Sequence, residues 1–352
     1  MNFSVPAESA LKDIFADHFH IGAAVSSNTI ITQESLLTHH FNSITAENEM
    51  KFASVHPQED LYTFEEADRI VDFARKHGMA IRGHTLVWHN QTTDWLFRDK
   101  QNQLVSKAVL YERIRSHIQT VVSRYKGDIY AWDVVNEVIA DDGDQLLRAS
   151  NWTEIAGDEC IAKAFEYAHA ADPNALLFYN DYNESHPRKR DKIYTLVKSL
   201  LNRGVPIHGI GLQAHWNLFE PTLDDIRAAI EKYASLGLQL QLTELDVSVF
   251  RFEDKRIDLT EPEPGMLERQ AEFYEAVFKL LKEYGDVISA VTFWGAADDH
   301  TWLSDFPVRG RKNWPLLFDE RHRPKPAYYR VAALGNHLRG LKADDKRAIR
   351  PV

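Results

Sequence analysis

Two glutamates, each in an apolar segment, are the residues of this chain best suited to catalysis. Glu137 ends the segment at 132–137, and Glu244 lies in the segment at 240–246, 107 positions later (244 minus 137). Both segments are short apolar runs rich in β-branched residues, which is typical of buried strands. Two carboxylates that face one pocket can serve as the acid and the nucleophile in the hydrolysis of a glycosidic bond. The sequence therefore predicts this chemistry, provided that the fold brings the two strands together.

The segments around these glutamates belong to a repeating pattern of helix, glycine and strand. The glycines that follow the helical patterns are Gly78, Gly127, Gly204, Gly237 and Gly285, and a glycine after the last turn commonly ends a helix. Strands are predicted at residues 20–25, 43–48, 80–84, 129–137, 175–182, 207–215, 238–246 and 287–295. Eight strand–helix units over about 320 residues predict a single-domain (β/α)8 TIM barrel of the α/β class. We assign residues 1–341 to this barrel and 342–352 to a charged C-terminal tail that is expected to be frayed.

Polar and aromatic residues stand at or just after the carboxyl ends of seven predicted strands, where a parallel barrel binds its ligands. These residues are Glu47, Asn48, Lys51, His84, Trp88, Asn136, Glu137, Asn180, Tyr182, Gln213, His215, Glu244, Asp246, Trp294 and Trp302. A packed core would place aliphatic residues there, so the pattern favours an active site. Trp132 and Trp152 are instead expected to belong to the core.

Three other motifs resemble ligand sites but fit them poorly. The glycine pattern at 209–214 falls inside a strand rather than after one, which argues against a doubly wound dinucleotide-binding sheet. The acidic run at 141–144 lacks the terminal glutamate of a calcium loop and is interpreted as a solvated turn. His84, His89 and His215 do not have the spacing of a zinc site. No metal and no cofactor are therefore expected.

Composition excludes several classes of partner. The chain has 352 residues, 44% of them hydrophobic, and a formal net charge of −11. A negative charge of this size argues against nucleic acid and anionic membrane surfaces as partners. The single cysteine, Cys160, cannot form an intramolecular disulfide and is expected to be a small buried apolar residue. No apolar leader or membrane-spanning run is visible, so a cytoplasmic location is expected.

Five short segments together resemble the motifs of glycoside hydrolase family 10, the endo-β-1,4-xylanases. They are residues 45–51, 83–89, 132–137, 211–215 and 243–246, which occur in the same order as in the family. The resemblance covers residues 5–340 and shows no departure at a position that carries the chemistry. It implies a TIM barrel that hydrolyses xylan or xylo-oligosaccharides without a cofactor, and an enzyme of the intracellular type.

The resemblance also implies the roles of the catalytic residues. Glu137 would be the general acid and base, with a raised pKa, and Glu244 the nucleophile of a retaining double displacement through a covalent glycosyl intermediate. His215 would contact Glu244, with Asp246 behind the imidazole. Asn136 would bind the sugar 2-hydroxyl or the nucleophile.

The family pattern further assigns the residues that would bind substrate. Those on the glycone side would be Glu47, Asn48, Lys51, His84, Trp88 and Gln213. Trp294 and Trp302 would wall the sugar site, and Asn180 and Tyr182 would lie toward the aglycone side. Two alternatives stay open, a related barrel glycanase acting on glucan or mannan and a barrel that binds sugar without catalysis. The oligomeric state is not predicted.

Overall fold

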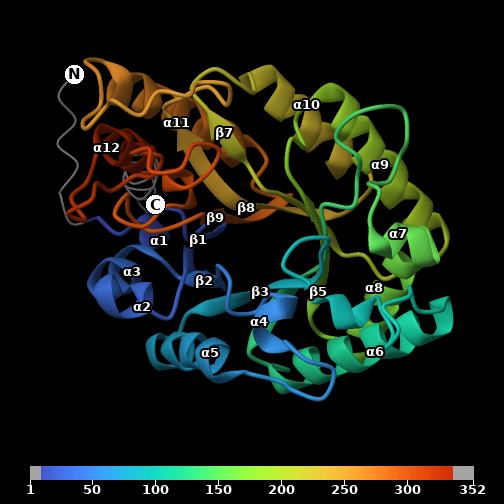
Figure 1. Cartoon of the computed structure of the whole chain (residues 1–352). Helices are drawn as coiled ribbons and strands as arrows, with labels where there is room; N and C mark the ends of the chain where they lie inside the picture. Colours follow the sequence, from blue (N-terminus) through green and yellow to red (C-terminus); the bar gives the residue numbers. More distant parts are fainter. Residues whose placement is uncertain (1–8, 336–352) are drawn as a thin grey trace, which may run out of the picture.

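The chain forms a closed barrel of parallel strands (Figure 1). The computed structural model describes residues 9–335, so the predicted tail at 342–352 lies outside the described residues. The strands are β1 (His20–Val25), β2 (Ser43–Ala46), β3 (Ala80–Val87), β4 (Ile129–Asn136), β5 (Leu176–Asp181), β6 (Gly209–Leu212), β7 (His215–Asn217), β8 (Gln239–Ser248) and β9 (Ile288–Phe293). Neighbouring strands pair in parallel from β6 back to β1 and on to β9 and β8, and a β6–β8 pairing closes the ring. The predicted (β/α)8 barrel is confirmed.

One predicted strand is divided in two. The strand expected at 207–215 appears as β6 and β7, because Ala214 between them takes a φ of +60°, which is incompatible with an extended strand. Gly209 and Gly211 lie within β6, so the glycine pattern is part of the barrel wall and not a dinucleotide loop. The strand interiors are buried almost throughout, as expected for a sheet covered on both faces.

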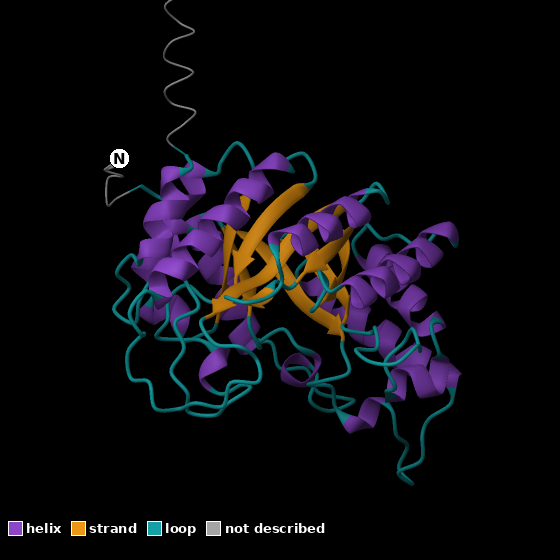
Figure 2. Cartoon of the chain, turned by 90° about the horizontal axis from the view of Figure 1, so that it is seen from above, coloured by secondary structure: helices purple, strands orange, loops and turns teal. Residues whose placement is uncertain are grey.

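Helices cover the outside of the barrel (Figures 1 and 2). They are α1 (Leu11–Ile14), α2 (Thr29–Thr32), α3 (Glu34–His40), α4 (Phe52–Val55), α5 (Glu65–His77), α6 (Lys107–Arg124), α7 (Asn151–Ala156), α8 (Glu159–Ala171), α9 (Pro187–Asn202), α10 (Leu223–Ala234), α11 (Met266–Glu283) and α12 (Pro326–Ala333), with short 3-10 turns at Asp94–Leu96 and Trp302–Ser304. Within residues 9–335, none is both long and apolar enough to cross a membrane.

The helix ends follow the local sequence signals closely. Gly78 caps α5 with a φ of +63°, the left-handed conformation that glycine adopts without a steric cost. Gly127, Gly204 and Gly237 also have positive φ, whereas Gly285, two residues after the end of α11, does not. At the other end of a helix, the Thr222–Asp225 capping box begins α10.

An ion pair is enclosed inside the barrel. The Arg82 guanidinium of β3 donates to both carboxylate oxygens of Asp133 in β4, over 3.1 Å and 2.7 Å, and its Nε donates to Gln241 over 2.5 Å. Arg82 and Asp133 are fully buried. Asp133 also accepts from His84 Nδ1 at 2.9 Å, so the ion pair fixes the ring of His84, one of the predicted site residues.

Removal of this buried carboxylate is expected to destabilise the protein strongly. Asp133→Ala leaves the Arg82 charge without its partner in the barrel interior, and we expect the free energy of unfolding to fall by about 3–5 kcal/mol. Urea denaturation measures the change. The matched control is Asp158→Ala, which breaks an exposed pair with Arg203 and should cost less than about 1 kcal/mol. Similar small losses in both variants would contradict this account of the barrel interior.

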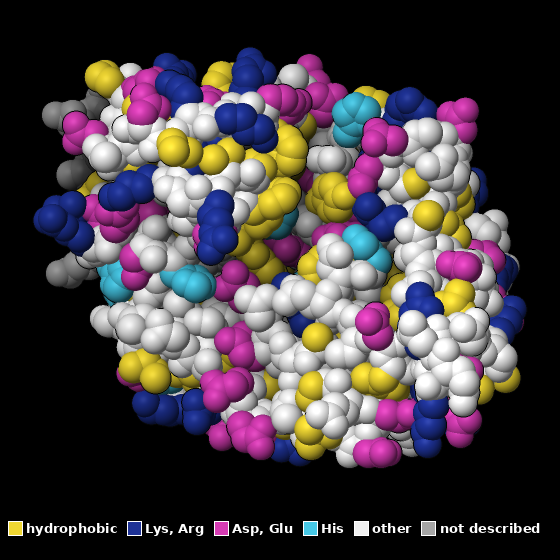
Figure 3. All heavy atoms as spheres, in the orientation of Figure 1, with side chains coloured by type: hydrophobic (Ala, Val, Ile, Leu, Met, Phe, Trp, Pro, Cys, Tyr) yellow, Lys and Arg dark blue, Asp and Glu magenta, His cyan; other side chains and the backbone are white. Residues whose placement is uncertain are grey.

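Long loops gather at the carboxyl ends of the strands, the side toward which the strand arrows point in Figure 2. The stretch at 247–265 begins in the last residues of β8 and continues as a long loop to α11. Part of it is anchored, since Val249 and Phe250 pack with Met266 and Trp314, whereas Phe252 is exposed. This face carries the central hollow visible in Figure 3.

Candidate active site

Glu137 and Glu244 belong to one buried cluster at the loop-bearing face. Glu137 directly follows β4, and Glu244 lies in β8, where the pairing with β9 shifts register between Leu242 and Leu245. Such an irregularity changes the direction of the side chains near it. The two carboxylates are 9% and 4% exposed. The strand-end positions predicted for both glutamates therefore lead into a single site.

Three amide side chains join the two carboxylates. Asn180 Nδ2 donates to Glu244 Oε1 over 2.8 Å, and Gln213 Nε2 donates to Glu137 Oε1 over 2.9 Å. The side-chain amide of Asn136 lies between them, 3.0 Å from Asn180 Nδ2 and 3.2 Å from Gln213 Nε2. A continuous set of hydrogen bonds thus fixes the position of each carboxylate relative to the other.

Glu137 is in an environment that favours its protonated form. Burial raises the pKa of this carboxyl, and the negative charges of Asp181 and Glu244 add to the effect. Hydrogen bonds from Gln213 and from Trp88 Nε1, the latter at 2.7 Å, oppose the rise without cancelling it. Glu137 can therefore hold a proton in the pH range where an exposed glutamate has lost it.

Glu244 is in the opposite environment. Burial by itself would raise the pKa of this carboxyl, but the charge of the His84 ring and the hydrogen bond from His215 outweigh burial and lower it. His215 Nε2 lies 3.1 Å from Glu244 Oε2, and His84 Nδ1 lies 4.0 Å from Oε1. Glu244 is therefore held as an anion, whereas the environment of Glu137 favours its protonated form. Two carboxyl groups whose pKa values are pushed apart in this way can supply one site with both an acid and a nucleophile.

His215 is held between two carboxylates. Its Nδ1 lies 3.0 Å from Asp246 Oδ2, and its Nε2 faces Glu244. Burial by itself would lower the pKa of the imidazole, but the charge of Asp246 and the hydrogen bonds to both acids raise it to about 10. Asp246 in turn accepts from Trp302 Nε1 over 2.8 Å. The ring is thus a fixed cation that stabilises the charge on Glu244.

The predicted residues that follow β2 converge on the same cluster. Lys51 Nζ donates to Asn48 Oδ1 over 3.0 Å and lies 4.9 Å from the centre of the Trp88 ring. Burial lowers the pKa of Lys51, while the charges of Glu244 and other nearby carboxylates oppose the shift. Glu47 Oε2 lies 2.8 Å from His300 Nε2. These groups offer hydrogen bonds of both kinds to a polar ligand beside the carboxylates.

Trp294 and Trp302 provide the aromatic part of the site. Trp294 is buried with its ring centre 5.4 Å from that of His84 and 6.1 Å from that of His215. Trp302 lies 4.7 Å from His215 and is stacked on Phe306 at 5.2 Å with an interplanar angle of 13°. Aromatic rings next to polar donors and acceptors suit a ligand with both apolar and hydroxyl faces.

Comparison with known proteins decides the family. The sequence model of glycosyl hydrolase family 10 matches residues 10–334, which is nearly all of the chain that the structure describes. The chain belongs to glycosyl hydrolase family 10. The family predicted from the five short segments is therefore confirmed.

Several relatives match this family 10 chain over almost their full length. It is 60% identical to an endo-1,4-beta-xylanase of Geobacillus stearothermophilus, over 93% of this chain and 98% of that one. The crystal structure of xylanase XynB from Paenibacillus barcinonensis, complexed with a conduramine derivative, is 54% identical with a TM-score of 0.91, covering 94% of this chain and 99% of that one. A mutant structure in complex with xylotriose is 52% identical with a TM-score of 0.90, covering 92% and 99%.

Two residues predicted to bind sugar are hydrogen-bonded to the two glutamates of the site. Asn180 is fully buried, and both atoms of its side-chain amide have partners, because Oδ1 accepts from Thr243 over 2.6 Å while Nδ2 donates to Glu244 and Asn136. The amide of Asn180 therefore fixes the Glu244 carboxylate, and its assignment with Tyr182 to the aglycone side stays a prediction. Gln213 is likewise buried and bonded directly to Glu137.

Tyr182 stands apart from the central cluster. Its hydroxyl donates to Asp141 over 2.5 Å and accepts from Arg148 over 2.8 Å, and Lys189 Nζ lies 3.8 Å from its ring centre. Asp141 thus forms ion pairs with Arg148 and Lys189 while remaining exposed, which agrees with the interpretation of 141–144 as a solvated turn. Asp142 and Asp144 are exposed, as expected.

Several functional residues were not predicted from the sequence. Asp133 supports His84, Arg148 contacts the main chain of Glu137, and His300 pairs with Glu47. Asp133 could have been found from the sequence, because it is a charged residue inside an apolar strand. Arg148 and His300 lie in loops, whose periodicity carries no such signal.

The remaining predictions concern the core and metals. Trp132, Trp152 and Cys160 are buried, which confirms their assignment to the core. Among residues 9–335, no group of three or more His, Cys, Asp or Glu side chains is arranged to hold a metal ion.

Proposed function

We propose that this family 10 chain is an endo-1,4-β-xylanase that cleaves β-1,4-xylosidic bonds of xylan or xylo-oligosaccharides with retention of configuration. The observation that carries the proposal is the pair of buried glutamates with opposite pKa shifts, joined by Asn180, Asn136 and Gln213. The names of the relatives support the choice of xylan as substrate.

In the first step, the C1–O bond to the leaving sugar breaks while Glu244 attacks the anomeric carbon. Glu137 donates its proton to the departing oxygen, so the leaving sugar departs as a neutral alcohol. A glycosyl ester to Glu244 forms. The Asn180 and His215 contacts fix the attacking carboxylate, and a fixed geometry lowers the barrier because little reorganisation is left to be done.

In the second step, a water molecule attacks the same carbon from the opposite side of the ester. Glu137, now ionised, accepts the proton of that water, and Glu244 departs as the carboxylate. Two inversions at one carbon give net retention. The cationic His215 favours the departing anion, and the return of the proton to Glu137 restores the starting state.

A timed product analysis tests this function. Xylohexaose is incubated with the enzyme, products are identified by chromatography, and the configuration of the newly formed reducing end is followed by NMR before mutarotation. We expect internal cleavage and the β-anomer first. The α-anomer first would rule out retention. Faster cleavage of cellohexaose or mannohexaose in parallel assays would favour a glucanase or mannanase, and a lack of cleavage of all three would favour a barrel that only binds sugar.

The pH dependence of kcat/KM is expected to be bell-shaped. Activity requires ionised Glu244, whose pKa is lowered, so activity falls only at pH values below the ordinary glutamate range. It also requires protonated Glu137, whose pKa is raised, so activity falls again as the pH rises above that range. Initial rates on xylohexaose across the pH range measure both limbs. An acidic limb above the ordinary glutamate pKa of about 4.3 would contradict the assignment.

The cytoplasmic location and the preference for short xylo-oligosaccharides are part of the same proposal. Both follow from the expectation of an intracellular enzyme. Fractionation of the source cells tests the location, and comparison of kcat/KM on xylohexaose and on polymeric xylan tests the preference. An equal kcat/KM per cleavable bond on xylohexaose and on polymeric xylan would contradict the preference for short xylo-oligosaccharides.

A further inference from the structure

The main chain of Glu137 adopts an unusual conformation. Its φ is +57°, in the left-handed region that residues other than glycine rarely occupy. Both of its peptide groups are held: the N–H donates to the Asn180 carbonyl over 2.9 Å, and the carbonyl accepts from Arg148 Nε over 3.0 Å. The direction in which the carboxyl leaves the end of β4 therefore depends on these two hydrogen bonds.

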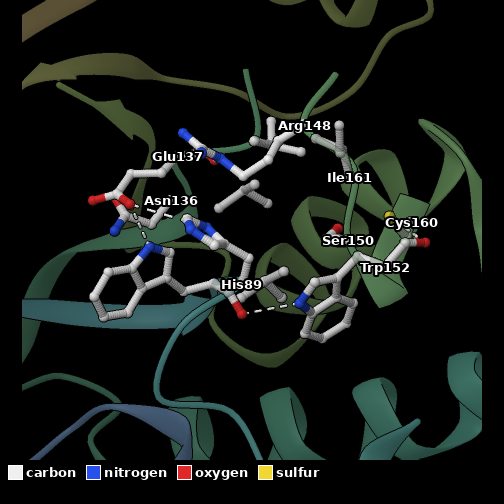
Figure 4. A pocket seen from close by; sticks show the side chains of 12 residues that line it. His89, Asn136, Glu137, Arg148, Ser150, Trp152, Cys160 and Ile161 are labelled. Atoms are coloured by element: carbon white, nitrogen blue, oxygen red, sulfur yellow. Dashed lines mark hydrogen bonds and ion pairs between the residues drawn. The ribbon is translucent and has the colours of Figure 1, made fainter. Parts of the chain in front are cut away.

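Arg148 is itself fixed on its other edge. Its Nη2 donates to the Tyr182 hydroxyl over 2.8 Å and lies 2.8 Å from Asp141 Oδ2. Asp141 is tied in turn to Lys189 at 2.6 Å. Figure 4 shows the Arg148 side chain lying beside Glu137. One planar guanidinium thus connects the loop after β4, the end of β5 and the main chain of Glu137.

We propose that Arg148 is a positioning residue for proton donation, holding the Glu137 peptide in its left-handed conformation and so directing the carboxyl at the leaving-group oxygen. The inference rests on the proposed function, since it assumes that Glu137 is the acid. Without Arg148, the Glu137 carbonyl loses its hydrogen-bond donor, and the peptide is free to relax toward an ordinary conformation. A small displacement of a catalytic group costs a large part of its effect.

Two substrates separate positioning of the acid from general damage to the site. Xylohexaose has a poor leaving group and needs the proton of Glu137, whereas 2,4-dinitrophenyl β-xylobioside has a leaving group that needs none. For Arg148→Met we expect kcat/KM on xylohexaose to fall about 10- to 100-fold. On the dinitrophenyl substrate we expect kcat/KM to stay within about threefold of the wild type, because nucleophilic attack by Glu244 is unaffected.

Arg148→Lys tests whether charge or geometry matters. Lysine keeps the positive charge, but a single ammonium cannot bond both the Glu137 carbonyl and Asp141 as the planar guanidinium does. We expect the same selective loss on xylohexaose. The matched control is Arg188→Met, because Arg188 bonds the same loop through the Gly143 carbonyl and Asp144, both at 3.2 Å, without touching Glu137. This control should behave as the wild type on both substrates.

The outcomes are distinguishable. Equal losses on both substrates in the Arg148 variants, or full activity of Arg148→Lys on xylohexaose, would overturn the positioning role. A wild-type enzyme that does not cleave xylohexaose would instead refute the proposed function. Thermal unfolding verifies that each variant is folded, and Arg148→Lys decides the question if Arg148→Met does not fold.

Discussion

Replacing Glu244 by alanine is expected to lower kcat/KM on xylohexaose by about 10⁴-fold or more, as loss of a catalytic nucleophile does elsewhere. No other carboxylate among the described residues is placed in the same way, hydrogen-bonded to both Asn180 and His215. Initial rates at high enzyme concentration measure the loss. Added azide should restore cleavage of an aryl β-xyloside with a good leaving group, because the anion fits the space left by the carboxylate, and the product should be the α-glycosyl azide.

An isosteric pair of variants serves as the control. Glu184 is as deeply buried as Glu244, and burial raises its pKa, which favours the neutral form that glutamine resembles in charge. Glu184→Gln should therefore keep nearly wild-type activity, whereas Glu244→Gln should lose most of it. If azide failed to rescue Glu244→Ala, and if both glutamine variants retained activity, Glu244 could not be the nucleophile.

Replacing Glu137 by alanine is expected to lower kcat/KM on xylohexaose by about 10²- to 10⁴-fold. The loss arises because the leaving sugar must depart without a proton. On 2,4-dinitrophenyl β-xylobioside the loss should be far smaller in kcat/KM, since dinitrophenolate is a good leaving group unprotonated. Steady-state kinetics on the two substrates measure the difference, and Glu137→Gln should also abolish the alkaline limb of the pH profile. Equal losses on both substrates would contradict the assignment of Glu137 as the acid.

The barrel and the central carboxylates could be predicted because their signals are local. Glu137 and Glu244 end or lie in apolar strands, and a parallel barrel places such ends on one face. The capping box of Thr222 and the glycine after α5 likewise depend on neighbouring residues only. The family motifs add the identity of the partners, for instance that His215 contacts Glu244.

The remaining features depend on contacts between distant segments. Asn180 was predicted to face the site because it ends a strand, but its hydrogen bonds to Thr243 and Glu244 could not be predicted, since these residues lie more than 60 positions away in the sequence. The break at Ala214 could not be predicted because alanine has no preference for a left-handed conformation. Arg148 is a loop residue whose proposed role depends on its hydrogen bond to the Glu137 carbonyl, and nothing in the sequence indicates that partner.

The same distinction applies to the electrostatics of the site. Two glutamates of identical chemistry acquire opposite pKa shifts, because burial and two nearby carboxylates raise the pKa of Glu137, whereas the imidazoles of His84 and His215 outweigh burial and lower that of Glu244. The sequence showed that Asp181, His84 and His215 exist at strand ends, but only the fold shows which of them faces which glutamate. The division of labour between acid and nucleophile is therefore a property of the tertiary structure.

Covalent trapping tests the central claim most directly. A 2-deoxy-2-fluoro xylobioside with a dinitrophenyl leaving group should react once per enzyme molecule. The fluorine slows both steps, but the good leaving group keeps the first step fast, so the glycosyl ester accumulates. Mass spectrometry of the intact protein and of its peptides locates the adduct. The account predicts one glycosyl group, on Glu244. An adduct on a different residue, or turnover of this substrate with the α-anomer formed first, would contradict it.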